Sequence, residues 1–277
     1  NQQHGGRGWL LALVLGLLSC MVMGLVLVWS NIERMDTTYF INIAQNELRE
    51  RRALRAKLEV EMAPLMPRIK AYRHMLVLGI GGSALGARAM QQAFAPGQDG
   101  PNHRGPCLWI ADNVCAERFE SLLGKLTPEE TVVVCISKSG GTIETISQYF
   151  LVRDWLKASV GEGWHDQMIV VTDERKGYLR EEADRHNIVS LPVPDHLGGR
   201  YSVLSAVGLV PAAFMGLPWE DFLEGAASVN APLVNDELGK PENLRNHPAW
   251  ALANWCFELS RHDYSQLVFF TYIPSWA

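Results

Sequence analysis

The sequence lacks any cysteine or histidine pattern that would hold a metal ion. Its five cysteines form no CxxC pair, and its eight histidines are scattered along the chain. No metal site and no cofactor are therefore expected. Three of the cysteines lie in or beside apolar runs, which favours buried thiols in a reducing compartment.

An excess of basic residues is also missing. The net charge is −5 and the isoelectric point about 5.9, whereas a nucleic-acid-binding domain usually carries a basic patch. We therefore expect no nucleic-acid partner. With 277 residues, 48% of them hydrophobic and 20% charged, the chain has the composition of a globular protein with one large domain or two smaller ones.

Charged residues are absent from Trp9 to Trp29, a nearly unbroken apolar run. A helix of this length spans roughly 30 Å, the thickness of the hydrocarbon core of a bilayer. The two tryptophans would then lie at the two membrane interfaces. A secretory signal is the alternative. The apolar region of such a signal is normally shorter, however, and no A-x-A-like cleavage site follows the run in this sequence. The sequence predicts a transmembrane segment within residues 1–30, with residues 9–29 in the membrane.

Residues 31–70 are charged and helical in character, and their apolar side chains recur every seven residues along two lines. One line holds Ile41, Leu48 and Met62, and the other Ala44, Leu58 and Leu65. This spacing predicts a coiled-coil-like helix, or alternatively a single amphipathic helix, that Pro64 and Pro67 end. A membrane helix followed by such a segment resembles the small bitopic bacterial division proteins.

From His74 onward, apolar strands alternate with helices. Strands are expected at residues 75–80, 107–111, 131–136, 168–172 and 188–192. Helices are expected at residues 84–94, 116–126, 142–158 and 177–186. This alternation predicts an α/β fold in three layers, with a parallel five-stranded sheet covered by helices on both faces. Ligands of such sheets bind at the carboxyl ends of the strands, at a switch point.

The stretch Ser137-Lys138-Ser139-Gly140-Gly141-Thr142 follows the third strand and opens a helix. The unpaired N–H groups and the dipole of a helix start attract anions, and glycines let the backbone approach closely. Three hydroxyls and an ammonium add donors for phosphate oxygens. The stretch therefore suits a phosphate cradle; a Ser/Gly-rich turn with an ordinary N-cap is the alternative.

Two further glycine loops lie at or near strand ends. In Gly79-Ile80-Gly81-Gly82-Ser83-Ala84-Leu85-Gly86 the third glycine falls too late for a dinucleotide fingerprint. Only Asp112, close to the end of the second strand, leaves a nucleotide as an alternative. The other loop, Asp195 to Ser202, presents Arg200 at the expected start of a helix running through Val207 and Val210. This guanidinium could stabilise developing negative charge, or form a structural salt bridge.

Taken together, the three motifs are a strong signal for one protein family. G-I-G-G-S-A-L-G, S-K-S-G-G-T-I-E-T and G-G-R-Y-S-V-L-S-A-V-G-L, in this order, resemble glucose-6-phosphate isomerases of the bacterial type over about residues 71–277. The resemblance implies two flavodoxin-like sugar-isomerase (SIS) domains, the first at residues 71–240 and the second, of which only the start is expected here, from residue 241 to 277. It also implies a hexose 6-phosphate ligand and a homodimer, with the active site between the domains and across the dimer interface.

The resemblance also implies roles for individual residues. The sugar phosphate would be bound by Ser137, Lys138, Ser139 and Thr142. The sugar would be lined by Gly82, Ser83 and Gly199. Arg200 would stabilise the enediolate intermediate, and Glu144 would support a catalytic histidine from elsewhere.

The implied reaction interconverts glucose 6-phosphate and fructose 6-phosphate, a step of glycolysis and gluconeogenesis. A carboxylate shuttles a proton between carbons 2 and 1. In the family this base follows a strand like the one expected at residues 266–270, so the base, the ring-opening histidine and a late lysine are expected beyond Ala277. The alternatives are a non-catalytic, membrane-tethered sugar-phosphate-binding module and a division scaffold.

The two resemblances imply different compartments. Hexose phosphates are cytoplasmic, so the isomerase part is expected in the cytoplasm, whereas the division proteins place their coiled coil outside it. We therefore hypothesise that segments of different origin are joined near residues 67–74.

Overall fold

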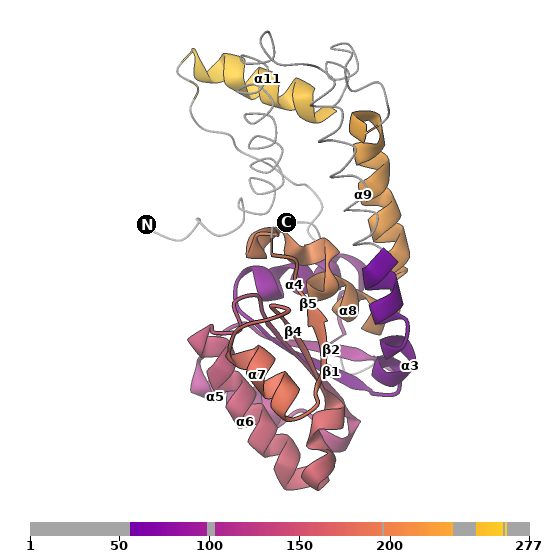
Figure 1. Ribbon diagram of the computed structural model, residues 1–277, viewed down its shortest axis with the longest axis vertical. Helices are drawn as coiled ribbons and strands as arrows, with labels where there is room; N and C mark the ends of the chain where they lie inside the picture. Colours follow the sequence, from indigo (N-terminus) through magenta and orange to yellow (C-terminus); the bar gives the residue numbers. More distant parts are fainter. Residues whose placement is uncertain (1–55, 99–102, 196, 235–247, 263, 265–277) are drawn as a thin grey trace. The chain divides into compact units, whose positions relative to one another are not determined.

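The computed structural model describes residues 56–98, 103–195, 197–234, 248–262 and 264 (Figure 1). They belong to two compact units. The first runs from Lys57 to Trp219 and contains the sheet. The second contains α11 (Pro248–Ser260) and all of α9 (Trp219–Val234) except its first residue. The site described below lies wholly within the first unit.

Five parallel strands form the sheet, in the order β2-β1-β3-β4-β5. The strands are β1 (His74–Leu78), β2 (Cys107–Ala111), β3 (Thr131–Ser137), β4 (Met168–Thr172) and β5 (Val189–Pro192). The predicted α/β class and five-stranded parallel sheet are confirmed, and each strand starts within one residue of its expected position. This strand order is that of flavodoxin-like doubly wound folds.

The helices of the sheet unit have the following bounds. They are α3 (Leu65–Lys70), α4 (Gly82–Phe94), α5 (Ala116–Leu123), α6 (Ile143–Val160), α7 (Tyr178–Arg185) and α8 (Ala206–Phe214). Three 3₁₀ segments join them: η1 (Pro128–Glu130), η2 (Gly161–Gln167) and η3 (Gly199–Leu204).

Buried side chains alternate between the two faces of the sheet, as the period of a strand requires. Leu76 and Leu78 of β1 belong to a cluster with Phe119 of α5, Tyr149 of α6 and Leu179 of α7. The other face is covered by α4 and α8, which contact strands and each other, and α3 packs on α8 (Figure 1). Burial on both faces explains why the strands read as continuous apolar runs.

The order of the strands places a switch point between β1 and β3. The chain leaves β1 for β2 on one side, and β3 joins the other side. The helix after β1 and the helix after β3 therefore cover opposite faces, and their amino termini diverge at the carboxyl edge of the sheet. Crevices of this kind are where doubly wound sheets bind ligands.

The end of the predicted coiled-coil-like helix packs against this unit. Residues 56–62 are helical, a turn follows at residues 63–64, and Met62 and Ile69 are fully buried. Pro67 does not end a helix but lies in the first turn of α3, where an N–H group would have no intrahelical partner. The predicted coiled coil before residue 56 and the predicted transmembrane segment lie outside the described residues. None of the helices that the structure describes is long and apolar enough to cross a membrane.

One helix starts later than expected. The sequence predicted a helix that begins near Arg200, whereas Arg200 lies in η3 and α8 begins only at Ala206. The Ser205 hydroxyl explains the boundary, because it accepts a hydrogen bond from the Val207 N–H at 3.4 Å and so caps α8.

Candidate functional site

Three hydroxyls of the Ser137–Thr142 stretch gather at the carboxyl end of β3. The Ser137 hydroxyl lies 2.9 Å from the Thr142 hydroxyl and 3.5 Å from the Ser139 hydroxyl. Ser137 is buried, Thr142 is half-buried and Ser139 is exposed. A ligand reaching this end of the strand therefore meets three hydroxyl groups on one small patch.

The start of α6 lacks the ordinary cap that the alternative interpretation required. Thr142 occupies the N-cap position with extended backbone angles, but its side chain makes no capping hydrogen bond. Its hydroxyl is paired with Ser137 instead. The first N–H groups of α6 thus have no side-chain acceptor, and together with the helix dipole they favour an anion at this point.

Close packing of two glycines shapes the loop. Gly140 has a φ of 63°, and a Cβ atom at this position would lie 3.0 Å from the Thr172 hydroxyl oxygen and 3.1 Å from the Gly177 Cα atom. A Cβ atom on Gly177 would lie 2.4 Å from the Ser139 carbonyl oxygen. Larger side chains would push the loop after β3 away from the loop after β4, so both glycines are needed for the shape of the patch.

The loop after β1 meets the segment that follows β5. A Cβ atom on Gly82, at the start of α4, would lie 2.3 Å from the Gly199 carbonyl oxygen and 2.8 Å from the Arg200 nitrogen. The predicted sugar-lining residues Gly82, Ser83 and Gly199 are thereby brought to one place. All three predicted loops converge at the carboxyl edge of the sheet.

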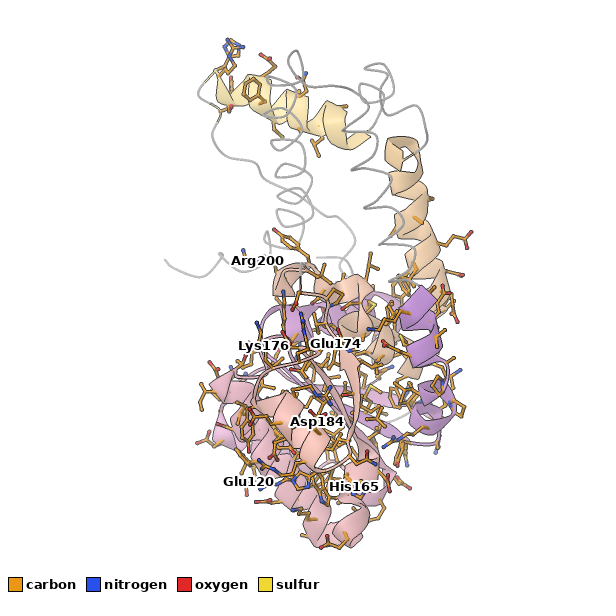
Figure 2. The ribbon with its side chains drawn as sticks, in the orientation of Figure 1. Glu120, His165, Glu174, Lys176, Asp184 and Arg200 are labelled. Atoms are coloured by element: carbon orange, nitrogen blue, oxygen red, sulfur yellow. The ribbon has the colours of Figure 1, made fainter. Side chains whose placement is uncertain are left out.

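Arg200 is exposed at this edge. Among the residues that the structure describes, its guanidinium pairs with no carboxylate, so the alternative of a structural salt bridge gains no support there. Figure 2 shows Arg200 and Lys176 at one end of the sheet unit and His165 at the other. The guanidinium is available to an incoming negative charge.

The Lys138 ammonium is hydrogen-bonded to two backbone carbonyl groups. It donates to the carbonyl oxygen of Asp195 at 2.7 Å and to that of Leu197 at 2.6 Å. Two of its three N–H donors are therefore engaged with the segment after β5. The phosphate contact that the sequence predicted for this lysine stays a prediction, and in the structure its ammonium lies on these two carbonyl groups.

Two acidic residues near the site, Glu144 and Asp112, have different surroundings. Glu144 lies in the first turn of α6, half-buried, where a carboxylate interacts favourably with the helix dipole. Asp112, which left a nucleotide ligand open, accepts hydrogen bonds from Arg88 at 2.8 and 3.0 Å. Its carboxylate is thus engaged by the protein rather than free for a ribose, which disfavours the nucleotide alternative.

Sequence reasoning missed the loop after β4. The Thr172 hydroxyl donates to the Ser137 carbonyl oxygen at 2.7 Å, and the Asp173 N–H donates to the Lys138 carbonyl oxygen at 3.1 Å. The Asp173 carboxylate in turn accepts the N–H groups of Arg175 and Lys176, which hold its pKa below the ordinary value. Because β4 is the parallel neighbour of β3, the same strand-end rule that selected the other loops could have found this one.

A second missed contact fixes the direction of α6. The buried Gln148 side chain donates to the Asn113 carbonyl oxygen at 3.0 Å, which ties the first turns of α6 to the loop after β2.

No group of three or more potential metal ligands occurs among the described residues.

The part of the chain that carries these loops matches a known protein family. Residues 67–245 match the family model of phosphoglucose isomerase. This match covers well over half of the chain and contains every predicted site residue. The chain belongs to the phosphoglucose isomerase family.

Relatives named glucose-6-phosphate isomerase match part of the chain. The chain is 40% identical over 155 residues to a glucose-6-phosphate isomerase from Thermus thermophilus, covering 56% of this chain and 36% of the relative. It is 39% identical over 182 residues to the enzyme from Rubrobacter xylanophilus, covering 65% and 41%. The chain thus spans about two fifths of the length of these relatives.

Solved structures share the fold. The crystal structure of a hypothetical protein from Thermus thermophilus superposes with a TM-score of 0.59 at 29% identity, covering 81% of this chain and 54% of that one. A glucose-6-phosphate isomerase from Chlamydia trachomatis superposes with a TM-score of 0.55 at 24% identity, covering 66% and 35%. The phosphoglucose isomerase match ends at residue 245, before most of the predicted start of a second sugar-isomerase domain.

Proposed function

We propose that this chain supplies the sugar-phosphate-binding part of a glucose-6-phosphate isomerase, which interconverts glucose 6-phosphate and fructose 6-phosphate. The observation that carries the proposal is the convergence of three loops at the switch point of the sheet. There, three hydroxyls, the uncapped start of α6 and a guanidinium without a carboxylate partner among the described residues lie on one edge. All of these groups suit a phosphate ester and an anionic intermediate.

The phosphate end of the ligand is assigned to the loop after β3. Ser137, Ser139 and Thr142 donate their hydroxyl hydrogens to phosphate oxygens, and the free N–H groups of α6 add backbone donors. The present Ser137–Thr142 hydrogen bond of 2.9 Å would be exchanged for these contacts. A hydroxyl can make that exchange without moving its backbone, because it needs only to rotate.

The sugar end is assigned to the loops after β1 and β5. Gly82, the adjacent Ser83 and Gly199 line the sugar, because the backbones of Gly82 and Gly199 meet without an intervening side chain. When a proton leaves carbon 2, the electron pair passes to the carbonyl oxygen at carbon 1 and an enediolate forms. Arg200 stabilises that negative charge, since its guanidinium stays protonated.

Glu144 is assigned a supporting role. From the first turn of α6 its carboxylate would orient a histidine that assists ring opening. His165 lies at the opposite end of the unit (Figure 2). No described residue is assigned the proton shuttle between carbons 2 and 1.

The larger assembly is also a proposal. We assign residues 71–240 to a first sugar-isomerase domain and residues from 241 onward to a second, and we expect the complete enzyme to be a homodimer. A non-catalytic sugar-phosphate-binding module would use the same cradle. Turnover, rather than binding, separates the two functions.

Thermal unfolding of the full chain tests the binding step. Ligand that binds only the folded state stabilises it by about 1.4 kcal/mol at ten times the dissociation constant, which raises Tm by about 3–6 °C. We expect this rise with fructose 6-phosphate and none with fructose. The double variant Ser139→Ala/Thr142→Val serves as the control and should lose the rise; an equal rise in wild type and double variant would remove the cradle from the proposal. A coupled isomerase assay on the same sample then reports turnover.

A further inference from the structure

The Lys138 side chain bridges two loops that are far apart in the sequence. Its ammonium donates to the carbonyl oxygens of Asp195 and Leu197, at 2.7 and 2.6 Å. These acceptors lie 57 and 59 positions further along the chain, in the segment between β5 and η3. Lys138 itself is half-buried at the end of β3, so its stem starts inside the phosphate loop and its charge ends on the segment that carries Arg200.

The bridged segment has a second attachment at its other end. The Gly199 carbonyl oxygen packs against Gly82 of α4 and accepts the Ser202 hydroxyl at 2.6 Å. The first attachment is at Asp195 and Leu197, the second is at Gly199, and Arg200 follows the second directly. The backbone that leads into Arg200 is therefore held at two points.

The ammonium has no carboxylate partner of its own among the described residues. The Asp195 carboxylate pairs with Arg175 at 3.2 Å instead, and the hydroxyls of the cradle pair with each other. Charge-assisted hydrogen bonds to carbonyl groups are about twice as strong as neutral ones. The geometry thus gives the Lys138 ammonium one task, which is to hold the carbonyl groups of Asp195 and Leu197.

We propose that Lys138 is a positioning residue that sets the location of Arg200 by clamping the segment after β5 to the phosphate loop, rather than a direct phosphate ligand. The assignment of Arg200 to the enediolate rests on the proposed function. The clamp itself is a property of the unliganded chain. Its loss leaves two carbonyl groups unpaired and frees the segment next to Arg200, whereas the hydroxyls and the α6 N–H groups remain to bind phosphate.

Amide hydrogen exchange of the full chain without ligand tests the clamp. Lys138→Met should accelerate exchange in residues 197–204 at least tenfold, and Lys138→Arg should return it to within about threefold of wild type, because a guanidinium can donate to the same carbonyl groups. Lys176→Met is the matched control, since Lys176 is an exposed lysine of the neighbouring loop and its loss removes the same charge. Unchanged exchange in Lys138→Met would overturn the proposal.

Inorganic phosphate separates the clamp from a phosphate contact. We expect Lys138→Met and Lys176→Met to bind phosphate equally, within about threefold of wild type. A much larger loss confined to Lys138→Met, with wild-type loop exchange, would make Lys138 a direct ligand and overturn the clamp. If wild type binds neither phosphate nor fructose 6-phosphate, the proposed function fails while the exchange experiment still decides the clamp.

A measurement on the wild-type chain covers the case in which Lys138→Met does not fold. Amine-reactive labelling followed by mass spectrometry compares the two lysines in one sample. The Lys138 amine should react at least tenfold more slowly than the Lys176 amine, because two hydrogen bonds hold it. Equal rates would contradict the clamp.

Discussion

Two clusters of polar side chains in the sheet unit differ in how far their hydrogen-bonding capacity is used. On the α6–α7 face, the fully buried Glu182 carboxylate accepts the Tyr149 hydroxyl at 3.0 Å and the Arg185 guanidinium at 2.5 Å, and lies 3.5 Å from Arg153. At the carboxyl edge, the cradle hydroxyls contact each other and accept one backbone N–H, from Gly141 to Ser139 at 3.2 Å, and Arg200 has no carboxylate partner among the described residues.

This difference separates a structural cluster from a binding site. The Glu182 cluster is saturated by the protein, and burial together with Glu182 raises the pKa of Tyr149, so that the phenol stays a donor. A saturated cluster stabilises the fold but has nothing to offer a ligand. The cradle keeps exchangeable donors at the edge of the sheet, where Ser139 is exposed and Thr142 is half-buried.

The largest expected effect comes from breaking the saturated cluster. Glu182→Ala removes a buried charge and leaves the Tyr149 hydroxyl unpaired, so we expect the free energy of unfolding to fall by about 2–4 kcal/mol. Its exposed neighbour provides the control: Glu181→Ala should change stability by less than about 0.5 kcal/mol. Chemical denaturation measures both. Equal stability of the two variants would mean that the cluster contributes nothing.

A glycine substitution at the carboxyl edge should affect stability and ligand binding at once. Gly82→Ala places a methyl group against the Gly199 carbonyl oxygen, and overpacking of this kind costs about 1–3 kcal/mol. Because relief requires the Arg200 segment to move, we also expect fructose 6-phosphate binding to be lost. Gly163→Ala, where a Cβ atom meets nothing within 4 Å, should leave both properties intact; calorimetric titration and melting curves check them.

Two threonines, Thr131 at the start of β3 and Thr142 at the N-cap of α6, sharpen the comparison further. Thr142→Val should weaken fructose 6-phosphate binding about tenfold, the value of one charge-assisted hydrogen bond, with little change in stability. The buried Thr131 donates to the Thr127 carbonyl oxygen at 2.7 Å. Thr131→Val should therefore lower stability by about 1 kcal/mol and leave binding unchanged. The account fails if the two substitutions have the same effects on fructose 6-phosphate binding and on stability.

Much of this architecture could be predicted from the sequence because burial on both faces leaves a plain signal. Strand β3 is buried along its whole length, so its apolar run and the polar stretch after it stood out. The motifs around Gly82, Ser137 and Arg200 then identified the edge at which the loops meet.

Long-range pairings were not predictable in the same way. Nothing in the local sequence indicates that Lys138 reaches carbonyl groups 57 and 59 positions away, or that Glu182 collects partners from two helices. The delayed start of α8 depended on one hydroxyl, that of Ser205, which competes with an otherwise continuous helical pattern. These features are decided by packing rather than by propensity or spacing.

The smallest expected effect lies at the amino edge of the sheet. His74 is buried and accepts the Trp109 indole N–H at 3.1 Å, and burial lowers the pKa of His74 below its ordinary 6.5. The folded state therefore binds fewer protons than the unfolded state, so this contribution is complete above about pH 6.5 and is lost as the pH falls through the folded pKa. Subtracting the stability profile of His74→Gln from that of wild type between pH 8 and 4 isolates it. A stability difference that does not change with pH would contradict the lowered pKa of His74.

A crystal structure of the full chain with fructose 6-phosphate tests the central claim most directly. The account predicts phosphate oxygens within about 3.2 Å of the Ser137, Ser139 and Thr142 hydroxyl oxygens, with the sugar against Gly82 and Gly199 and the Arg200 guanidinium facing its reactive end. The Lys138 ammonium should remain on the Asp195 and Leu197 carbonyl oxygens. Phosphate bound elsewhere on the chain, with the cradle hydroxyls still paired to each other, would contradict the account.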